Sequence, residues 1–165
     1  MKKSDIALIL GVIVVIIISI FAFKDTKEEV KEPIVLSDDF AEVKQISYDD
    51  YDAMLSEEKT FILVISREGC GYCDMYLPII KEVAEEEQLP IYSVDLATFT
   101  EEESAAFSES NSFLKKGDWG TPTTLILKGS EVIDKLSGYT EKESVIEFFE
   151  KTISTDSTEN NEVGE

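Results

Sequence analysis

Short, strongly apolar runs alternate with longer amphipathic segments along most of the chain. Residues 60–66 are apolar almost without interruption, which is typical of a strand covered on both faces of a sheet. Residues 91–95 have the same character, and residues 41–46 alternate weakly between apolar and polar positions. Residues 124–127 and 132–136 flank a turn-forming Lys-Gly-Ser-Glu segment and predict a β-hairpin. These runs therefore predict the strands of one sheet.

Two amphipathic segments predict helices, one between the strands at residues 41–46 and 60–66 and one between those at residues 60–66 and 91–95. Ser47 is placed to begin one helix, and the aromatic and aliphatic residues that follow it at helical spacing are expected in the core. The second helix opens near Cys73, and its apolar positions extend through residues 77–84. Pro78 lies inside this helix, where it removes one backbone hydrogen bond and bends the helix axis.

Two further helices are predicted later in the chain. Thr98 or Thr100 caps a helix whose first turn is rich in glutamate, a placement that the helix dipole favours. The end of this helix is expected near Gly117. Its apolar side is expected to contain Ala105, Ala106, Phe107, Phe113 and Leu114. Thr140 and Glu143 have the spacing of a capping box, which predicts the start of the last helix.

A basic head and a long apolar run begin the chain. Lys2 and Lys3 precede residues 6–23, which carry no charge. As a helix this run would be about 27 Å long, close to the thickness of a bilayer core. A cleaved signal peptide is the alternative, but the run is long for one and no A-x-A cleavage motif follows. We therefore expect a single-pass membrane helix with a cytoplasmic N-terminus and an extracytoplasmic domain.

Polar segments flank the predicted folded domain. Residues 24–39 mix charged residues and a proline with few large apolar ones, which predicts a flexible, solvated linker. Residues 154–165 are almost entirely polar or acidic and predict a disordered tail. The expected organisation is a membrane anchor at residues 1–23, the linker, one domain at residues 40–153, and the tail.

The chain is strongly acidic. Lys and Arg total 15 against 35 Asp and Glu, and the formal net charge is −20. Nucleic acid is therefore not expected as a partner, because phosphate backbones are bound by basic surfaces. The acidic residues are spread over the linker, the predicted helix faces and the tail, which is typical of a solvated surface.

Cys70 and Cys73 are the only cysteines, and they lie between the apolar run at residues 60–66 and the following helix. Unpaired N–H groups and the dipole at a helix N-terminus stabilise a thiolate at Cys70. The two cysteines can also close on each other, so that the pair cycles between dithiol and disulfide. A zinc site needs four ligands, whereas the chain has no histidine and no third cysteine. A purely structural disulfide over so short a loop would stabilise little. We expect a redox pair, with no metal and no cofactor.

The order of these elements, from residue 41 to residue 153, resembles the thioredoxin fold. Cys70 and Cys73 fall between the central strand and its helix, and Pro78 matches the helix-kinking proline of that family. The segment Gly120-Thr121-Pro122-Thr123 resembles the one that carries the family's cis-proline. The resemblance implies an α/β fold with a central mixed sheet flanked by helices, and a cis peptide bond before Pro122 facing the cysteines.

The sequence also departs from the thioredoxin pattern. The family's buried aspartate and the lysine on the neighbouring strand correspond to Val64 and Ile91, so the usual internal proton acceptor is absent. Gly69 replaces the tryptophan before the first cysteine, and no histidine lies between the cysteines. Residues 95–122 are longer than in a minimal thioredoxin, which predicts an extra helical turn or a lid.

The resemblance implies a thiol–disulfide oxidoreductase that acts on thiols and disulfides of proteins or peptides. Cys70 would attack the substrate and Cys73 would resolve the mixed disulfide. The plan is similar to that of membrane-anchored thioredoxin-like proteins of Gram-positive bacteria, including bacteriocin transport accessory proteins. A membrane partner that exchanges electrons with the pair is a further expectation. The alternative is a non-catalytic module that binds or assembles an exported peptide.

Five residues around the cysteines are expected to contact the substrate. Thr121 and Pro122 would hold its backbone beside Cys70. Gly71 and Tyr72 lie between the cysteines, and Tyr72 is either a substrate contact or ordinary exposed surface. Trp119 either shields the cysteines or packs beneath the loop that precedes Pro122.

Overall fold

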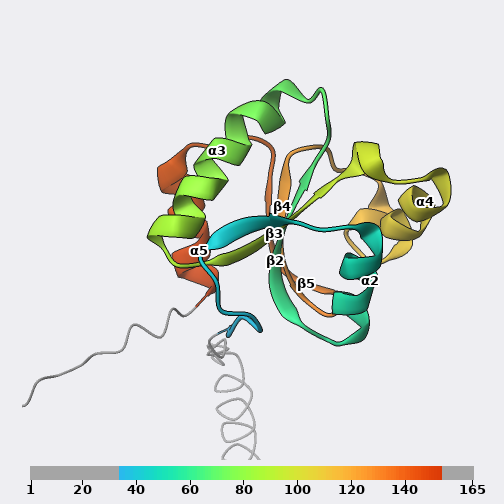
Figure 1. Cartoon of the computed structure of the whole chain (residues 1–165), viewed down its shortest axis with the longest axis horizontal. Helices are drawn as coiled ribbons and strands as arrows, with labels where there is room; N and C mark the ends of the chain where they lie inside the picture. The colour runs from blue at the N-terminus through green and yellow to red at the C-terminus, as the bar shows by residue number, and fades with distance from the viewer. Residues whose placement is uncertain (1–33, 154–165) are drawn as a thin grey trace, which may run out of the picture. The chain divides into compact units, whose positions relative to one another are not determined.

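The computed structural model describes residues 34–153, coloured in Figure 1. The predicted membrane helix, most of the predicted linker and the predicted tail lie outside the described residues. Within residues 34–153, no helix combines the length and the apolar character needed to cross a membrane.

A mixed sheet forms the centre of the described part of the chain. Its five strands lie in the order β1-β3-β2-β4-β5. β1, β3 and β2 are parallel, whereas β4 runs antiparallel to both β2 and β5. The strands are β1 (Glu42–Gln45), β2 (Thr60–Ser66), β3 (Pro90–Asp95), β4 (Thr123–Lys128) and β5 (Glu131–Ser137). The predicted strands and the predicted hairpin of β4 and β5 are therefore confirmed.

Helices cover both faces of this sheet, as Figure 1 shows. α3 and α5 pack on one face, and α2 and α4 pack on the other. The helices are α2 (Tyr48–Ser56), α3 (Gly71–Glu86), α4 (Glu101–Glu109) and α5 (Lys142–Thr152), with short 3₁₀ helices at Leu96–Thr98 and Leu114–Lys116. The predicted α/β architecture, a mixed sheet between helices, is confirmed.

β2 is the central strand, and it contributes to the core on both sides. Ile62 and Val64 face the cluster beneath α3 and α5. Phe61, Leu63 and Ile65 face the cluster beneath α2 and α4. Successive side chains of a strand point to opposite faces, so an apolar strand of this kind must be covered on both sides. All five side chains are at most 1% exposed.

Two predicted helix starts are confirmed by their side-chain caps. Ser47 caps α2 in a capping box with Asp50. Thr100, rather than Thr98, caps α4 in a second box with Glu103. The hydrogen bonds from Thr100 lower the pKa of the Glu103 carboxyl group. Each box satisfies backbone N–H groups that a helix start otherwise leaves unpaired.

The capping box predicted at Thr140 and Glu143 is wrong. The residue before α5 is Glu141, and it makes no side-chain cap. Its carboxylate instead accepts a hydrogen bond from the Tyr139 hydroxyl at 3.0 Å. The helix therefore begins one residue later than the motif predicts. The Glu141 carboxylate, which could have capped the helix, is hydrogen-bonded to Tyr139 instead.

The helix predicted to reach Gly117 is also shorter than expected. α4 ends at Glu109, and the separate 3₁₀ helix Leu114–Lys116 follows. The Asn111 side chain accepts hydrogen bonds from the N–H groups of Phe113 at 3.1 Å and Leu114 at 2.9 Å. Such local bonds compete with helical ones and end the helix. Ala105 and Ala106, predicted on its apolar side, are exposed.

The last part of the predicted linker, residues 34–39, packs against β2 and β3. Ser37 donates its N–H to the Thr60 carbonyl oxygen at 2.9 Å and accepts the Thr60 N–H at 2.8 Å. The Asp38 carboxylate accepts a hydrogen bond from the Tyr92 hydroxyl at 2.9 Å. The packed domain therefore begins closer to the N-terminus than the sequence predicts.

The double-sided packing of β2 predicts where substitutions destabilise the fold. Leu63→Ala removes a side chain that is 0% exposed and leaves a cavity. We expect it to lower the free energy of unfolding by about 2 to 5 kcal/mol. Val35→Ala, at a side chain that is 74% exposed, should change it by less than about 0.5 kcal/mol. Urea denaturation of both variants measures this, and equal losses would contradict the assigned packing.

A cysteine pair at the start of a helix

Cys70 lies where β2 ends and α3 begins. The intervening turn is closed by a hydrogen bond from the Cys70 N–H to the Arg67 carbonyl oxygen at 3.1 Å. Gly69 has a φ angle of 78°, which glycine adopts without strain. Cys70 is the N-cap of α3, and the helix starts at Gly71, slightly earlier than the predicted start near Cys73.

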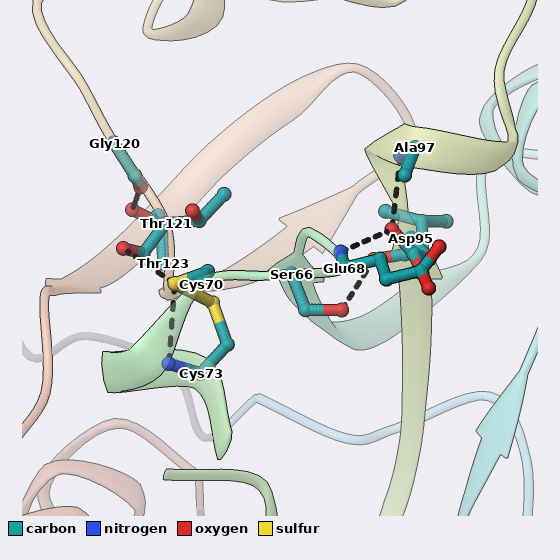
Figure 2. Close-up of a disulfide and its surroundings, with 10 residues drawn as sticks. Ser66, Glu68, Cys70, Cys73, Asp95, Ala97, Gly120, Thr121 and Thr123 are labelled. Carbon is teal, nitrogen blue, oxygen red and sulfur yellow. Dashed lines mark hydrogen bonds between the residues drawn. A yellow bond between two sulfur atoms is a disulfide. The ribbon is translucent and has the colours of Figure 1, made fainter. Parts of the chain in front are cut away.

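The Cys73 N–H donates a hydrogen bond to the Cys70 sulfur at 3.2 Å (Figure 2). This bond is the capping interaction of α3, with sulfur in place of the usual side-chain oxygen. A donor aimed at the sulfur stabilises a thiolate there, as does the positive end of the helix dipole. The local fold therefore favours the anion at Cys70.

Cys70 and Cys73 form a disulfide, with a distance of 5.2 Å between their Cα atoms. The two sulfurs have different surroundings. Cys73 is 1% exposed and belongs to the core, whereas Cys70 is partly exposed. A reagent from solvent can therefore reach Cys70 more easily than Cys73.

The loop before β4 lies against Cys70. The Thr121–Pro122 peptide bond is cis, as the resemblance implies. The Thr121 carbonyl oxygen is 3.5 Å from the Cys70 sulfur (Figure 2). The Gly138 N–H donates to the Pro122 carbonyl oxygen at 2.8 Å, which fixes the loop to the end of β5. The fold thus brings together Cys70 and Thr121, two of the predicted site residues.

Beneath the disulfide the core is apolar. Val64 and Ile91, the positions of the departures from the family pattern, are both 0% exposed and lie in the cluster beneath α3. One polar pair interrupts this cluster, because the Tyr76 hydroxyl and the Thr124 hydroxyl lie 2.8 Å apart. Burial raises the pKa of Tyr76 to about 12. Sequence reasoning missed both residues, since a tyrosine and a threonine in apolar patterns give no signal.

The outer surface beside the cysteines carries exposed apolar side chains. Tyr72 is 65% exposed and Met75 is 53% exposed. The Tyr72 ring lies 6.4 Å from the ring of Tyr139, measured between centroids. Sequence reasoning selected Tyr72 but missed Met75 and Tyr139. Tyr139 comes from the segment after β5, so only the fold brings it to this surface.

Trp119 makes the contacts of a packing residue. Its indole N–H donates to the Leu114 carbonyl oxygen at 2.9 Å. Its ring lies 6.2 Å from that of Phe107, in the cluster beneath α2 and α4. These contacts correspond to the second alternative drawn from the sequence, in which Trp119 packs beneath the loop. Substrate contact by Trp119 stays a prediction.

A carboxylate ties the loop before Cys70 to β3 (Figure 2). The Asp95 Oδ1 atom accepts hydrogen bonds from the N–H groups of Glu68 at 3.0 Å and Ala97 at 2.9 Å. The Ser66 hydroxyl donates to the Val94 carbonyl oxygen at 3.0 Å. These bonds position the turn that presents Cys70. Across residues 34–153, no group of three or more His, Cys, Asp or Glu side chains is placed to hold a metal ion.

Comparison with solved structures identifies the architecture. The chain is similar to thioredoxin from Aeropyrum pernix, with 24% identity and a TM-score of 0.51 over 64% of this chain and 83% of that one. It is also similar to the short form of thioredoxin f from spinach chloroplast, with 18% identity and a TM-score of 0.53 over 71% and 98% of the two chains. The chain has the thioredoxin fold.

Sequence comparison gives a further similar protein. The chain is 28% identical over 99 residues to a protein of Brevibacillus choshinensis described as "Disulfide bond formation protein". The match covers 60% of this chain and 78% of the relative. No protein-family model matches the chain. In this thioredoxin fold, Cys70 and Cys73 lie at the start of α3, the helix that follows the central strand β2.

The Asp95 contacts generate a prediction about the loop that presents Cys70. Asp95→Ala removes the acceptor of two backbone N–H groups and should lower the free energy of unfolding by about 1 to 2 kcal/mol. Hydrogen exchange at the Glu68 amide should become faster. Asp95→Asn keeps a side-chain oxygen at this position and should have the smaller effect. Urea denaturation and amide exchange of the oxidised protein measure both effects, and indistinguishable Ala and Asn variants would disprove the assigned role.

Proposed function

We propose that this protein is a thiol–disulfide oxidoreductase that acts on protein or peptide substrates. The observation that carries the proposal is the Cys70–Cys73 disulfide at the start of α3, with the Cys73 N–H aimed at the Cys70 sulfur. The thioredoxin fold and the similarity to the Brevibacillus choshinensis protein described as a disulfide bond formation protein support the same activity.

The exchange reaction follows from the different exposure of the two sulfurs. A substrate thiolate attacks the Cys70 sulfur, the Cys70–Cys73 bond breaks, and Cys73 leaves as a thiolate. The product is a mixed disulfide between Cys70 and the substrate. A second substrate thiolate can then release Cys70 and leave the substrate oxidised. In the opposite direction, the Cys73 thiolate attacks Cys70 and releases the substrate as a thiolate.

Several groups around Cys70 are placed to hold an extended substrate. The Thr121 carbonyl oxygen beside the sulfur can accept a hydrogen bond from substrate backbone. Apart from its chain neighbours and the backbone of its own helix, no atom of residues 34–153 lies within 4 Å of a Cβ placed on Gly71, which leaves room for a peptide to approach. Tyr72, Met75 and Tyr139 offer apolar surface for the side chains next to the substrate cysteine. We assign Pro122 to the same site on the resemblance to the thioredoxin family, and Trp119 on its position directly before Gly120-Thr121-Pro122.

We further propose that the domain is tethered to the outer face of the cytoplasmic membrane. The support is the uncharged run at residues 6–23 behind Lys2 and Lys3. On this proposal the protein has the plan of the membrane-anchored thioredoxin-like proteins of Gram-positive bacteria, such as bacteriocin transport accessory proteins. A membrane protein that exchanges electrons with the Cys70–Cys73 pair would restore it after each turnover.

The proposed reaction predicts different behaviour for the two cysteines. In the reduced protein, iodoacetamide near neutral pH should label Cys70 before Cys73, because Cys73 is buried. Cys73→Ser should accumulate mixed disulfides with substrate proteins, whereas Cys70→Ser should accumulate almost none. Peptide mapping by mass spectrometry and non-reducing electrophoresis measure both effects.

The double variant Cys70→Ser/Cys73→Ser is the control for this experiment. An oxidoreductase loses its cellular role and its turnover of a protein disulfide in this variant. Retention of the full role without either cysteine would favour the alternative, a module that binds an exported peptide without redox chemistry. Trapping by Cys70→Ser alone would reverse the roles of the two cysteines.

Tethering predicts the behaviour of the full-length chain in cells. The protein should fractionate with membranes, and protease added to intact spheroplasts should degrade the domain. A cytoplasmic protein of similar size should stay intact in the same sample. A shortened, soluble form as the main species would contradict the proposed anchor.

A further inference from the structure

Cys73 must carry a negative charge once in every exchange, although it is buried. Its side chain is 1% exposed and belongs to the apolar core. Among residues 34–153, no Asp, Glu, Lys or Arg is buried. An anion in such surroundings is unfavourable unless a hydrogen-bond donor lies beside it. The Val64 side chain, at the position of the family's buried aspartate, has no polar atom. A hydrogen-bond donor for the Cys73 thiolate must therefore come from another residue on the inner side of α3.

The hydroxyl pair of Tyr76 and Thr124 lies on this inner side. Tyr76 follows Cys73 by three residues, so the two side chains lie on the same face of α3. Tyrosine side chains in helices lean towards the helix N-terminus, which here is the direction of Cys73. Thr124 is the residue of β4 directly opposite Val64, and paired residues share one face of a sheet. Both hydroxyl-bearing side chains are 0% exposed.

The pair has a proton to offer. Its two hydroxyl groups carry two protons, and the hydrogen bond between them, which either oxygen can donate, uses one. The raised pKa of Tyr76, caused by burial, keeps the phenol protonated at neutral pH. The phenol therefore acts as a donor and not as a base.

We propose that the Tyr76 hydroxyl, oriented by Thr124, donates a hydrogen bond to the Cys73 sulfur whenever that sulfur is an anion. This proposal rests on the oxidoreductase function above and assigns it a further residue. When a thiolate attacks Cys70, the electron pair of the broken bond moves to the Cys73 sulfur. The anion accepts the hydrogen bond and later takes a proton from water, while Tyr76 stays neutral throughout.

Ionisable groups elsewhere around this end of α3 lie at the surface or are partly exposed. They come from the loop before Cys70, from α3 itself, from the end of β3 and from the segment after β5. They are Arg67, Glu68, Tyr72, Asp74, Asp95, Tyr139 and Glu141. Lys142 lies at the other end of α3, where it pairs with Glu82 and Glu86. Salt screens such charges from Cys73, whereas it leaves a buried hydrogen bond almost unaffected. Measurement at high salt therefore separates their influence from that of Tyr76.

The test is the thiolate titration of Cys73 in the full-length chain carrying Cys70→Ser, followed by ultraviolet absorbance at high salt. Adding Tyr76→Phe removes the hydroxyl and keeps the ring. We expect the midpoint to rise by about one pH unit, a tenfold loss of thiolate at a given pH below it. In the chain with both cysteines, dithiothreitol should open the disulfide about three- to tenfold more slowly, because Cys73 becomes a poorer leaving group.

Tyr51→Phe is the matched control. Tyr51 is also 0% exposed, and its hydroxyl lies 2.7 Å from the Ser110 hydroxyl, but it belongs to the cluster on the other face of the sheet. The Tyr51→Phe substitution should leave the titration midpoint of Cys73 and the rate of reduction by dithiothreitol unchanged. Thr124→Val, a second variant of nearly equal shape, should move the midpoint in the same direction as Tyr76→Phe.

An unchanged midpoint in Tyr76→Phe or in Thr124→Val would overturn the proposal, as would an equal shift in Tyr51→Phe. Neither measurement uses a protein substrate. Failure of the oxidoreductase function would therefore appear separately, as absence of mixed disulfides in the Cys73→Ser chain. The two proposals can thus fail independently.

Discussion

Burial of β2 on both faces is the constraint on which the rest of this structure depends. Because every side chain from Phe61 to Ile65 is buried, helices must cover the sheet on both sides. The chain can leave the sheet only at the end of the strand, and there it turns at Gly69 and starts α3. Cys70 therefore lies at the surface and at a helix N-terminus at once. The same packing carries Cys73 inward, so one constraint produces two cysteines of different exposure.

This arrangement places unlike chemistry on the two sides of the disulfide. On the outer side, the Cys73 N–H and the Thr121 carbonyl oxygen contact the Cys70 sulfur, and Tyr72 offers exposed apolar surface. On the inner side lies the apolar cluster beneath α3 and α5. Among the described residues, one pair of hydroxyl groups in contact, those of Tyr76 and Thr124, interrupts this cluster. In the proposed exchange reaction, the outer side receives the substrate and the inner side accepts the charge that the bond-breaking step creates.

Local signals in the sequence were enough for most of the elements and for the cysteine pair. A strand with apolar side chains on both faces is stable only when both faces are covered, so the apolar run at residues 60–66 predicts a buried strand. The observed bounds of β2 are the same. Ser47 and Thr100 act within three residues of themselves, so the sequence predicts that Ser47 begins one helix and that Thr98 or Thr100 caps another, and both helix starts agree with the structure. The capping boxes that Ser47 and Thr100 form with Asp50 and Glu103 are visible only in the structure. The position of Cys70 at a helix start follows from the strand before it and the amphipathic segment after it.

Only the tertiary structure decided which distant residues meet at the cysteines. Asp95 reaches the Glu68 amide, and Tyr76 reaches Thr124, across separations that no local pattern encodes. The sequence also does not show whether a side chain or the helix backbone will bind a given N–H group. The Asn111 side chain accepts hydrogen bonds from the N–H groups of Phe113 and Leu114, so that α4 ends before the predicted position. Periodicity and capping are properties of a few neighbouring residues, and the sequence determines them directly. Contacts across the sheet depend on strand order and register, which are fixed only when the whole core packs.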